Sequence, residues 1–217
     1  MDFELNKTQK DIQKAVRDFA KGEFDKDLAL ELDNKHEFPK KIWQKAGEIG
    51  LIGVHFPEEY SGQGLGCLED ILVIEELCKN DSGIGSAISL CSFASELILH
   101  FGSDAQKEKF LPKVAEGEML SAGAFTEPDH GSDITFMDTT AIKDGDEWVI
   151  NGAKTFITNG GQAGFYSVMC QTDPDATPSY RGISIILVEA ETEGLSTASV
   201  GDKMGINMMA TAEVILK

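Results

Sequence analysis

Two short segments of this sequence carry residue types that can bind a phosphorylated ligand with a planar ring. The run Ala124–Asp133 reads AFTEPDHGSD, and the run Asn151–Gly160 reads NGAKTFITNG. The first combines hydroxyl and small residues around a proline, whereas the second places an aromatic residue just before a threonine. These two segments are therefore the strongest candidates in the chain for a binding site.

Each segment offers a different part of a flavin-binding site. Gly131 and Ser132 can present backbone N–H groups and a hydroxyl to a phosphate, as anion-binding loops do without cationic side chains. Thr126 and Thr158 can donate hydrogen bonds to a polar ring edge, and Phe156 can pack on the ring face. Together these groups predict a flavin cradle.

Taken singly, either segment could be turn chemistry, because Pro, Asn and Gly are common in turns. The ordered pair resembles the acyl-CoA dehydrogenase family, in which a T-E-P-x-x-G-S-D loop and a W/F-I-T-N-G strand end hold FAD. Phe156 stands where many members have Trp, which keeps an aromatic face. The resemblance implies flavin contacts by Phe125, Thr126, Ser132, Phe156, Ile157 and Thr158. Gly131 joins this set because of the anion-binding chemistry described above.

The resemblance also implies an activity. In that family a carboxylate base removes the α-proton of an acyl-CoA thioester while a hydride leaves the β-carbon for the flavin, and an electron-transfer flavoprotein then takes the electrons. Glu127 is implied to be a structural residue of its loop and not this base. We therefore expect FAD as the cofactor, an acyl-CoA as the substrate, the electron-transfer flavoprotein as a partner, and a homo-oligomer, in the family a homotetramer.

The resemblance places the acyl pocket along the segment from Ile84 to Phe101, which is rich in small residues. Ser86 and Ser89 are the candidates to face the acyl group there, with Ser132 near the same ligand. Gly85 aligns where glutaryl-CoA dehydrogenases carry an Arg, which disfavours a decarboxylating dicarboxyl-CoA substrate. Small residues would equally serve close packing between helices, so both interpretations stay open.

Helical patterns fill the first half of the chain. Asn6 with Gln9, and Ser103 with Gln106, have the spacing of capping boxes. The Gly-rich loop Tyr60–Gly66 has helical patterns on both sides, so it predicts a connection between helices and not a dinucleotide fingerprint, which must follow a strand. The expected helices cover Asn6–Lys26, Pro39–Gly50, Leu68–Lys79, Ile84–Phe101 and Ser103–Glu116, with Pro112 able to kink or end the last.

After Gly117 the pattern changes to short β-like runs. They cover Leu120–Phe125, Thr139–Lys143, Trp148–Ile150, Thr155–Thr158, Phe165–Gln171, Gly182–Glu189 and Ala212–Leu216. Asp144-Gly145 and Asn151-Gly152 predict hairpin turns. The sequence therefore predicts an α+β chain, with an N-terminal all-helical domain over residues 1–118 and an antiparallel β-barrel-like middle domain, binding flavin and acyl-CoA, over residues 119–217.

The composition argues against several classes of partner. A formal net charge of -18 disfavours nucleic acid and anionic membranes, so phosphates of coenzyme A need local charge, for which Lys154 and Arg181 are candidates. No apolar run approaches the roughly 20 residues of a membrane span, and a cytoplasmic protein is expected. The four cysteines lack the spacing of a metal site or a disulfide framework: Cys67, Cys78, Cys91 and Cys170.

The length of 217 residues is about half that of the family it resembles. The resemblance puts the catalytic Glu in a C-terminal helical domain, so we expect an N-terminal fragment that lacks this base and is inactive by itself. A natural short relative that binds flavin or a partner without catalysis is one alternative. A flavin oxidase or monooxygenase of the same fold is another.

Overall fold

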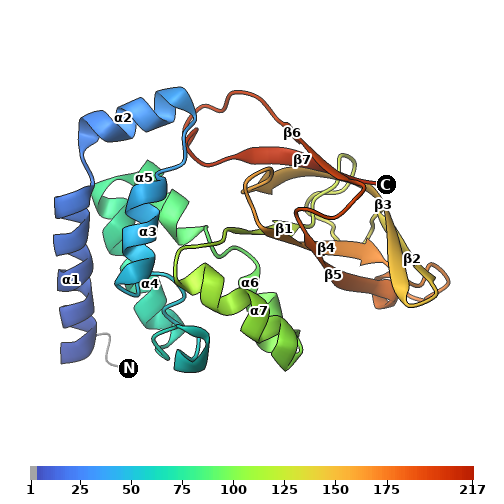
Figure 1. Cartoon of the computed structure of the whole chain (residues 1–217), viewed down its shortest axis with the longest axis horizontal. Helices are drawn as coiled ribbons and strands as arrows, with labels where there is room; N and C mark the ends of the chain where they lie inside the picture. Colours follow the sequence, from blue (N-terminus) through green and yellow to red (C-terminus); the bar gives the residue numbers. More distant parts are fainter. Residues whose placement is uncertain (1–3) are drawn as a thin grey trace. The chain divides into compact units, whose positions relative to one another are not determined.

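The computed structural model describes residues 4–217, and these residues form two compact units. The helical unit contains the described residues up to Ser92 together with Glu96–Met119 and Asp202–Met209. The β unit contains Phe93–Ser95, Leu120–Gly201 and Ala210–Lys217. Helices come first and strands later in the chain (Figure 1), and the prediction of an α+β protein is confirmed.

Helices form most of the first 115 residues, and their order follows the sequence. They are α1 (Lys7–Glu23), α2 (Lys26–Lys35), α3 (Lys40–Glu48), α4 (Cys67–Asn80), α5 (Ser82–Ser89), α6 (Ser95–Phe101) and α7 (Asp104–Ala115), with a short 3-10 turn η1 at Glu58–Tyr60. Both expected capping boxes are present, at Asn6 with Gln9 and at Ser103 with Gln106. Within residues 4–217, no helix combines the length and apolar character needed to cross a bilayer.

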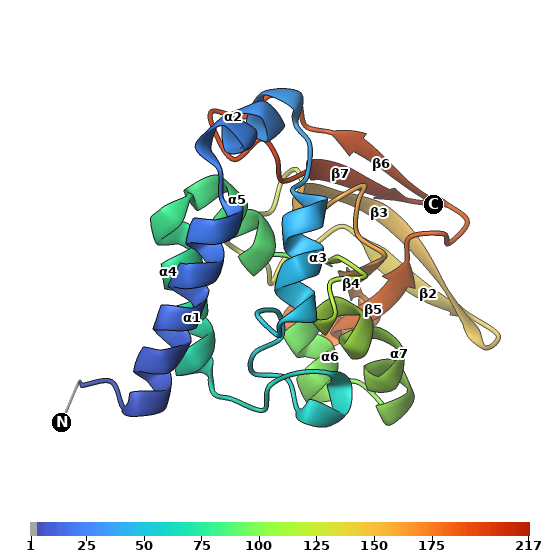
Figure 2. The ribbon, with the colours of Figure 1, turned by 60° about the vertical axis from the view of Figure 1, so that its left-hand side comes forward.

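Helix α1 packs along α4 (Figure 2), and polar bonds reinforce the apolar contact. Val16 and Ala20 on α1 are fully buried. Arg17 donates two hydrogen bonds, each of 3.0 Å, to the carboxylate of Glu76, whose side chain is almost fully buried. Buried carboxylates need such donors because an unpaired buried charge is costly.

Two helical expectations are wrong. Helix α2 was missed, and it is capped by Asp25, whose side chain accepts the Leu28 N–H at 2.9 Å. The expected single helix from Ile84 to Phe101 is two helices, because the chain turns between Leu90 and Ala94, where Ala94 adopts φ +69°. A residue other than glycine in this left-handed region cannot continue a right-handed helix.

The strands form one curled, mixed sheet. They are β1 (Ser121–Ala124), β2 (Thr140–Asp144), β3 (Glu147–Thr158), β4 (Phe165–Gln171), β5 (Ile183–Glu189), β6 (Leu195–Ser199) and β7 (Thr211–Leu216). The order is β1-β4-β2-β3-β7-β6, with β5 on the other edge of β4. Strand β1 runs parallel to β4, and β2 meets β4 in parallel at one pair, so the expectation of a purely antiparallel sheet is wrong.

Strand β3 is longer than expected. The hairpin at Asp144-Gly145 is confirmed, since Asp144 pairs with Glu147. The hairpin predicted at Asn151-Gly152 is wrong, because both residues lie inside β3. Glycine is needed at 152 for another reason: a Cβ there would lie 2.4 Å from the Thr139 hydroxyl oxygen. Strand β6 was missed because most of its residues are exposed and few are apolar.

The core of the β unit includes residues of β1, β3, β4, β5 and β7. Its central side chains are small on β1 and larger on the other strands. They are Ala122, Ala124, Ile157, Ala163, Tyr166, Val168, Val188, Val214 and Leu216. The first sequence motif begins at the last residue of β1, and the second covers the second half of β3 and the two residues after it.

Candidate functional site

The two sequence motifs meet in the β unit, although their strands are not neighbours in the sheet. The backbone N–H of Thr155 on β3 donates to the carbonyl of Thr126, just beyond β1, at 2.9 Å. In the sheet order, β4 and β2 stand between these strands. The curl of the sheet therefore brings together two segments that are about thirty residues apart in sequence.

A β-bulge shapes the second motif. On β3, Lys154 pairs with Val214 and Ile157 pairs with Ala212, so three steps along β3 match two along β7. Phe156 lies in the bulge with φ +56°, and it is 68% exposed. Bulges redirect side chains and are frequent beside active sites. Here the bulge presents an aromatic ring outward while its neighbours stay in the core.

A buried ion pair joins the two motifs inside the β unit. Lys154 is fully buried and Glu127 is 3% exposed, and the Lys154 ammonium lies 2.8 Å from a Glu127 carboxylate oxygen. The same ammonium donates to the carbonyl of Phe125 at 3.2 Å. The expectation that Lys154 supplies surface charge for coenzyme A phosphates is therefore wrong, since its charge is neutralised inside the unit. Arg181 is exposed.

Glu127 has the environment of a structural carboxylate. Burial alone would raise the pKa of Glu127, but the Lys154 ammonium and two backbone N–H donors outweigh burial and hold this pKa below its usual value. A carboxylate that accepts these bonds is a weak base. Its contacts agree with a structural role in the loop.

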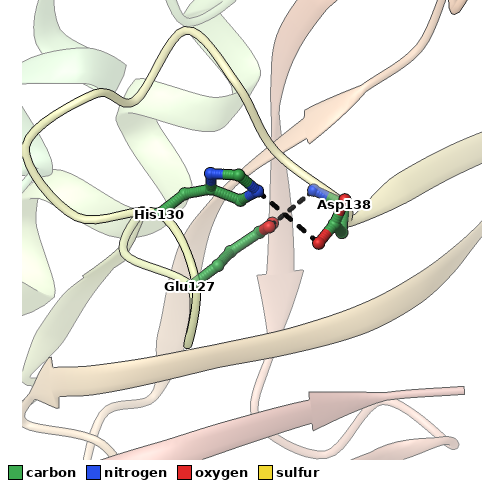
Figure 3. A group of neighbouring side chains, drawn as sticks. All are labelled: Glu127, His130 and Asp138. Carbon is green, nitrogen blue, oxygen red and sulfur yellow. Dashed lines mark hydrogen bonds and ion pairs between the residues drawn. The ribbon is translucent and has the colours of Figure 1, made fainter.

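Glu127 also closes the loop that carries Gly131 and Ser132. Figure 3 shows its carboxylate pointing at the Asp138 backbone, whose N–H lies 2.5 Å away, and the Thr139 N–H lies 2.9 Å away. His130 Nε2 lies 3.6 Å from the Asp138 carboxylate. The polar atoms of Glu127, His130 and Asp138 that could bind a metal ion lie within 4.8 Å of one another. The Glu127 carboxylate already accepts bonds from Lys154 and two backbone N–H groups, and these bonds hold the loop closed.

The loop tip and the strand end leave polar groups open to a ligand. Gly131 and Ser132 are exposed, and Thr126 and Thr158 are half-buried. Within residues 4–217, the hydroxyls of Thr126, Ser132 and Thr158 make no hydrogen bond to the protein. Such groups, together with an exposed ring, can hold an anion and a planar polar ring.

Two other residues that we expected to contact the flavin differ in how exposed they are. Phe125 is half-buried, and its ring centre lies 6.2 Å from that of Phe93. Ile157 is only 2% exposed and packs in the β core. We expected Ile157 to contact the ligand, but the bulge turns it inward, so its contribution is to support Phe156 and Thr158 from behind.

The candidate acyl-binding serines lie on helix α5 of the helical unit. Ser86 and Ser89 are half-buried, and the Ser89 hydroxyl donates to the carbonyl of Gly85 at 2.7 Å. A Cβ at Gly85 would lie 2.7 Å from the backbone nitrogen of Cys78 on α4. Glycine is therefore required by close packing of the two helices. The expectation that a dicarboxyl-CoA substrate is disfavoured stays a prediction.

Reasoning from sequence missed one residue that belongs to this site. Asn159 is fully buried, and its side-chain N–H donates to the carbonyl of Ser121 at the start of β1 at 2.8 Å. In the sequence this residue forms part of T-N-G, where Asn and Gly indicate a turn. The partner, 38 residues away, gives no signal in the local sequence.

Comparison with known proteins extends over the whole chain. The model of the acyl-CoA dehydrogenase N-terminal domain matches residues 6–118, and that of the acyl-CoA dehydrogenase middle domain matches residues 122–217. The acryloyl-CoA reductase (NADH) of Anaerotignum propionicum is 39% identical over 219 residues, which cover 100% of this chain and 55% of the relative. The short-chain-specific acyl-CoA dehydrogenase of Clostridium acetobutylicum is 37% identical over 218 residues, with 100% and 57% covered.

Solved structures share the fold. An acyl-CoA dehydrogenase from Geobacillus kaustophilus has a TM-score of 0.92 at 35% identity and covers 100% of this chain and 57% of its own. A glutaryl-CoA dehydrogenase from Mycobacterium smegmatis in complex with FADH2 has a TM-score of 0.88 at 30% identity, with 98% and 53% covered. The prolyl acyl carrier protein oxidase AnaB has a TM-score of 0.90 at 33% identity, with 99% and 57% covered.

The chain spans little more than half the length of the curated relatives described here, and within that span the similarity is continuous. Two family models together cover nearly the whole chain, both sequence motifs lie within the middle-domain match, and two relatives above 35% identity align over the full chain. The chain belongs to the acyl-CoA dehydrogenase family.

Proposed function

We propose that this chain is part of an FAD-dependent acyl-CoA dehydrogenase, which oxidises an acyl-CoA to the enoyl-CoA and passes the electrons to an electron-transfer flavoprotein. The observation that carries the proposal is the junction of the two motifs, where Thr155 bonds to Thr126 and the Phe156 ring is exposed. Support also comes from the relative crystallised with FADH2.

The chemistry of the cradle residues suits FAD. FAD, when bound, would supply an acceptor for a hydride, which carries the two electrons of the oxidation. The Gly131 and Ser132 amides and the Ser132 hydroxyl would hold its pyrophosphate, because a Cβ built at Gly131 meets nothing within 4 Å and the loop is open. Thr126 and Thr158 would donate to the ring edge, and Phe156 would cover a ring face.

A base for the α-proton has to come from outside these cradle residues. Glu127 is the buried carboxylate of the first motif, and it is held by Lys154 and two backbone N–H groups. Removing a proton would require Glu127 to give up these bonds inside a buried site. We therefore propose that another part of the native enzyme, whose relatives are nearly twice as long, supplies the base.

The acyl-CoA is proposed to contact Ser132 in the β unit and Ser86 and Ser89 on α5. We further propose a homo-oligomeric, cytoplasmic enzyme. These proposals follow from membership of the family, and the half-buried hydroxyls of the two α5 serines agree with a polar contact there.

The test of the flavin site is a pair of substitutions, Ser132→Ala and Thr158→Ala, made in the protein in its native form. Each removes a hydroxyl that makes no bond within the protein, so folding should be little changed while the FAD Kd rises about tenfold, the loss of roughly one hydrogen bond. Ser196→Ala on exposed β6 is the matched control and should leave the Kd unchanged. Unchanged FAD content in both site variants would remove this assignment.

A flavin oxidase is the second candidate, because the oxidase AnaB shares the fold at a TM-score of 0.90. The two activities differ in what accepts the electrons. A dehydrogenase consumes acyl-CoA only with an added electron acceptor, whereas an oxidase consumes oxygen. Oxygen uptake with acyl-CoA in the absence of any other acceptor would favour the oxidase.

A further inference from the structure

Asn159 connects three strands at the end of the second motif. Its side-chain N–H donates to the Ser121 carbonyl at 2.8 Å, and its backbone N–H donates to the Ala210 carbonyl, just before β7, at 2.9 Å. Its own carbonyl accepts from the backbone of Gln162 at 3.0 Å and of Ala163 at 2.8 Å. The residue is fully buried, so water does not compete for these bonds.

The bond to Ser121 matters because β1 and β3 have no ladder between them. Bonds that join the second motif to the first motif or to β1 include those of Thr155 N–H to Thr126, of the Lys154 ammonium to Phe125 and Glu127, and of Asn159 to Ser121. The bonds of Lys154 and Thr155 lie before Phe156, and the bond of Asn159 lies after Thr158. The exposed Phe156 and the Thr158 hydroxyl therefore sit on a short segment that is held at both ends.

Asparagine suits this position for two separate reasons. Its φ is +63°, a left-handed conformation that Asn and Gly tolerate better than other residues. Its side chain also has the N–H donor that the Ser121 carbonyl accepts. Gly would satisfy the backbone and lose the bond, whereas Asp would keep the backbone and place an oxygen against the carbonyl.

We infer that Asn159 is a positioning residue of the flavin site, which sets the distance between the two motifs by fixing the end of β3 to the start of β1. This inference rests on the proposed function, since it assigns Asn159 a role toward FAD. The Asn159 side chain acts through Thr158 and Phe156 and does not touch the cofactor.

The test compares Asn159→Gly with Ser61→Gly in the protein in its native form. Ser61 also has φ +63° and also donates one side-chain bond, to Glu116 at 2.6 Å in the helical unit, so it matches the backbone and bond changes away from the cradle. We expect Asn159→Gly to raise the FAD Kd by about tenfold or more and to broaden the visible flavin absorption band, and Ser61→Gly to change neither.

A second readout needs no flavin. Hydrogen exchange of the Thr155 N–H, which bonds to Thr126, should be at least about tenfold faster in Asn159→Gly than in the native protein. Asn159→Asp should reproduce both effects if the Gly variant folds poorly. Failure of the native protein to bind FAD would refute the proposed function and leave the exchange test of Asn159 intact. Native FAD affinity in the Asn159 variants would overturn the inference. If the Thr155 N–H exchanged faster in these variants while the FAD Kd stayed native, the Asn159–Ser121 bond would stabilise the fold without positioning the flavin site.

Discussion

Replacing Lys154 with methionine should destabilise the β unit by about 3–5 kcal/mol at neutral pH, the usual cost of removing one partner of a buried ion pair. The magnitude follows from burial: Lys154 is 0% and Glu127 3% exposed, and their charged atoms lie 2.8 Å apart. Methionine matches the length of the lysine stem, so little of this loss should come from packing. The variant keeps a buried Glu127 carboxylate that has only its two backbone donors and has lost the Lys154 ammonium.

Urea unfolding at several pH values separates the electrostatic cause from a packing defect. In the native protein the pKa of Glu127 is lowered from 4.5, so its contribution is present above that pH and is lost as the pH falls below it. In Lys154→Met, burial without the ammonium raises this pKa, so ionisation destabilises the fold above pH 4.5. The cost of the substitution should therefore grow as the pH rises from 4 to 7.

Two further variants sharpen the result. Adding Glu127→Gln to Lys154→Met removes the unpaired charge and keeps an acceptor for one of the two backbone N–H groups, which donate to different carboxylate oxygens, so the double variant should recover about 1–2 kcal/mol. Lys143→Met, at an exposed position on β2, is the control and should change stability by less than about 0.5 kcal/mol. A loss in Lys154→Met that is independent of pH and not relieved by Glu127→Gln would refute the reasoning.

Two more predictions concern the helical unit. Arg17→Gln should lower the urea midpoint of unfolding, because it leaves the buried Glu76 carboxylate short of donors, and a native-like midpoint would contradict this. Arg17, with Lys79, holds the pKa of Glu76 below 4.5, so native stability should fall with acidification below that pH, and less so in the variant. Asp70 and Glu96 raise the pKa of His55 from 6.5 to about 10, so its contribution is full below pH 6.5 and is lost as the pH approaches 10. Thermal melts should therefore show a steeper decline over this range in the native protein than in His55→Gln, and equal slopes would exclude the ion pairs as its cause.

Local signals predicted many elements of the fold. Capping residues at Asn6 and Ser103 identified the start of two helices, and alternating apolar residues identified β4 over the residues Phe165–Gln171. Helix α2 was missed because only Ala29 of its ten residues is buried, so its apolar periodicity is weak.

Contacts between distant segments could not be predicted in the same way. The four residues of β1 read SAGA, and nothing in them indicates that they pair in parallel with a strand more than forty residues later. Asn151-Gly152 has the composition of a hairpin turn, yet the glycine is there because Thr139 approaches its Cα. Local sequence shows which residues suit a turn but not which neighbour demands one.

In the candidate site, too, local features could be predicted and contacts between distant residues could not. Residue types predicted where Thr126, Ser132 and Thr158 lie, because their chemistry is local. The bonds of Lys154 to Glu127 and of Asn159 to Ser121 join residues 27 and 38 positions apart. They depend on the curl of the sheet, so they emerged only from the structure.

The bulge at Phe156 also changes how inward and outward positions must be counted along β3. In a regular strand, residues three apart face opposite sides, yet Lys154 and Ile157 both lie on the core side, opposite Val214 and Ala212. One residue more or fewer between them would send either the lysine or the isoleucine to the surface. The spacing K-T-F-I is therefore a length constraint as strict as any residue identity, and a relative with an insertion or deletion here has to lose the buried ion pair or rebuild its core.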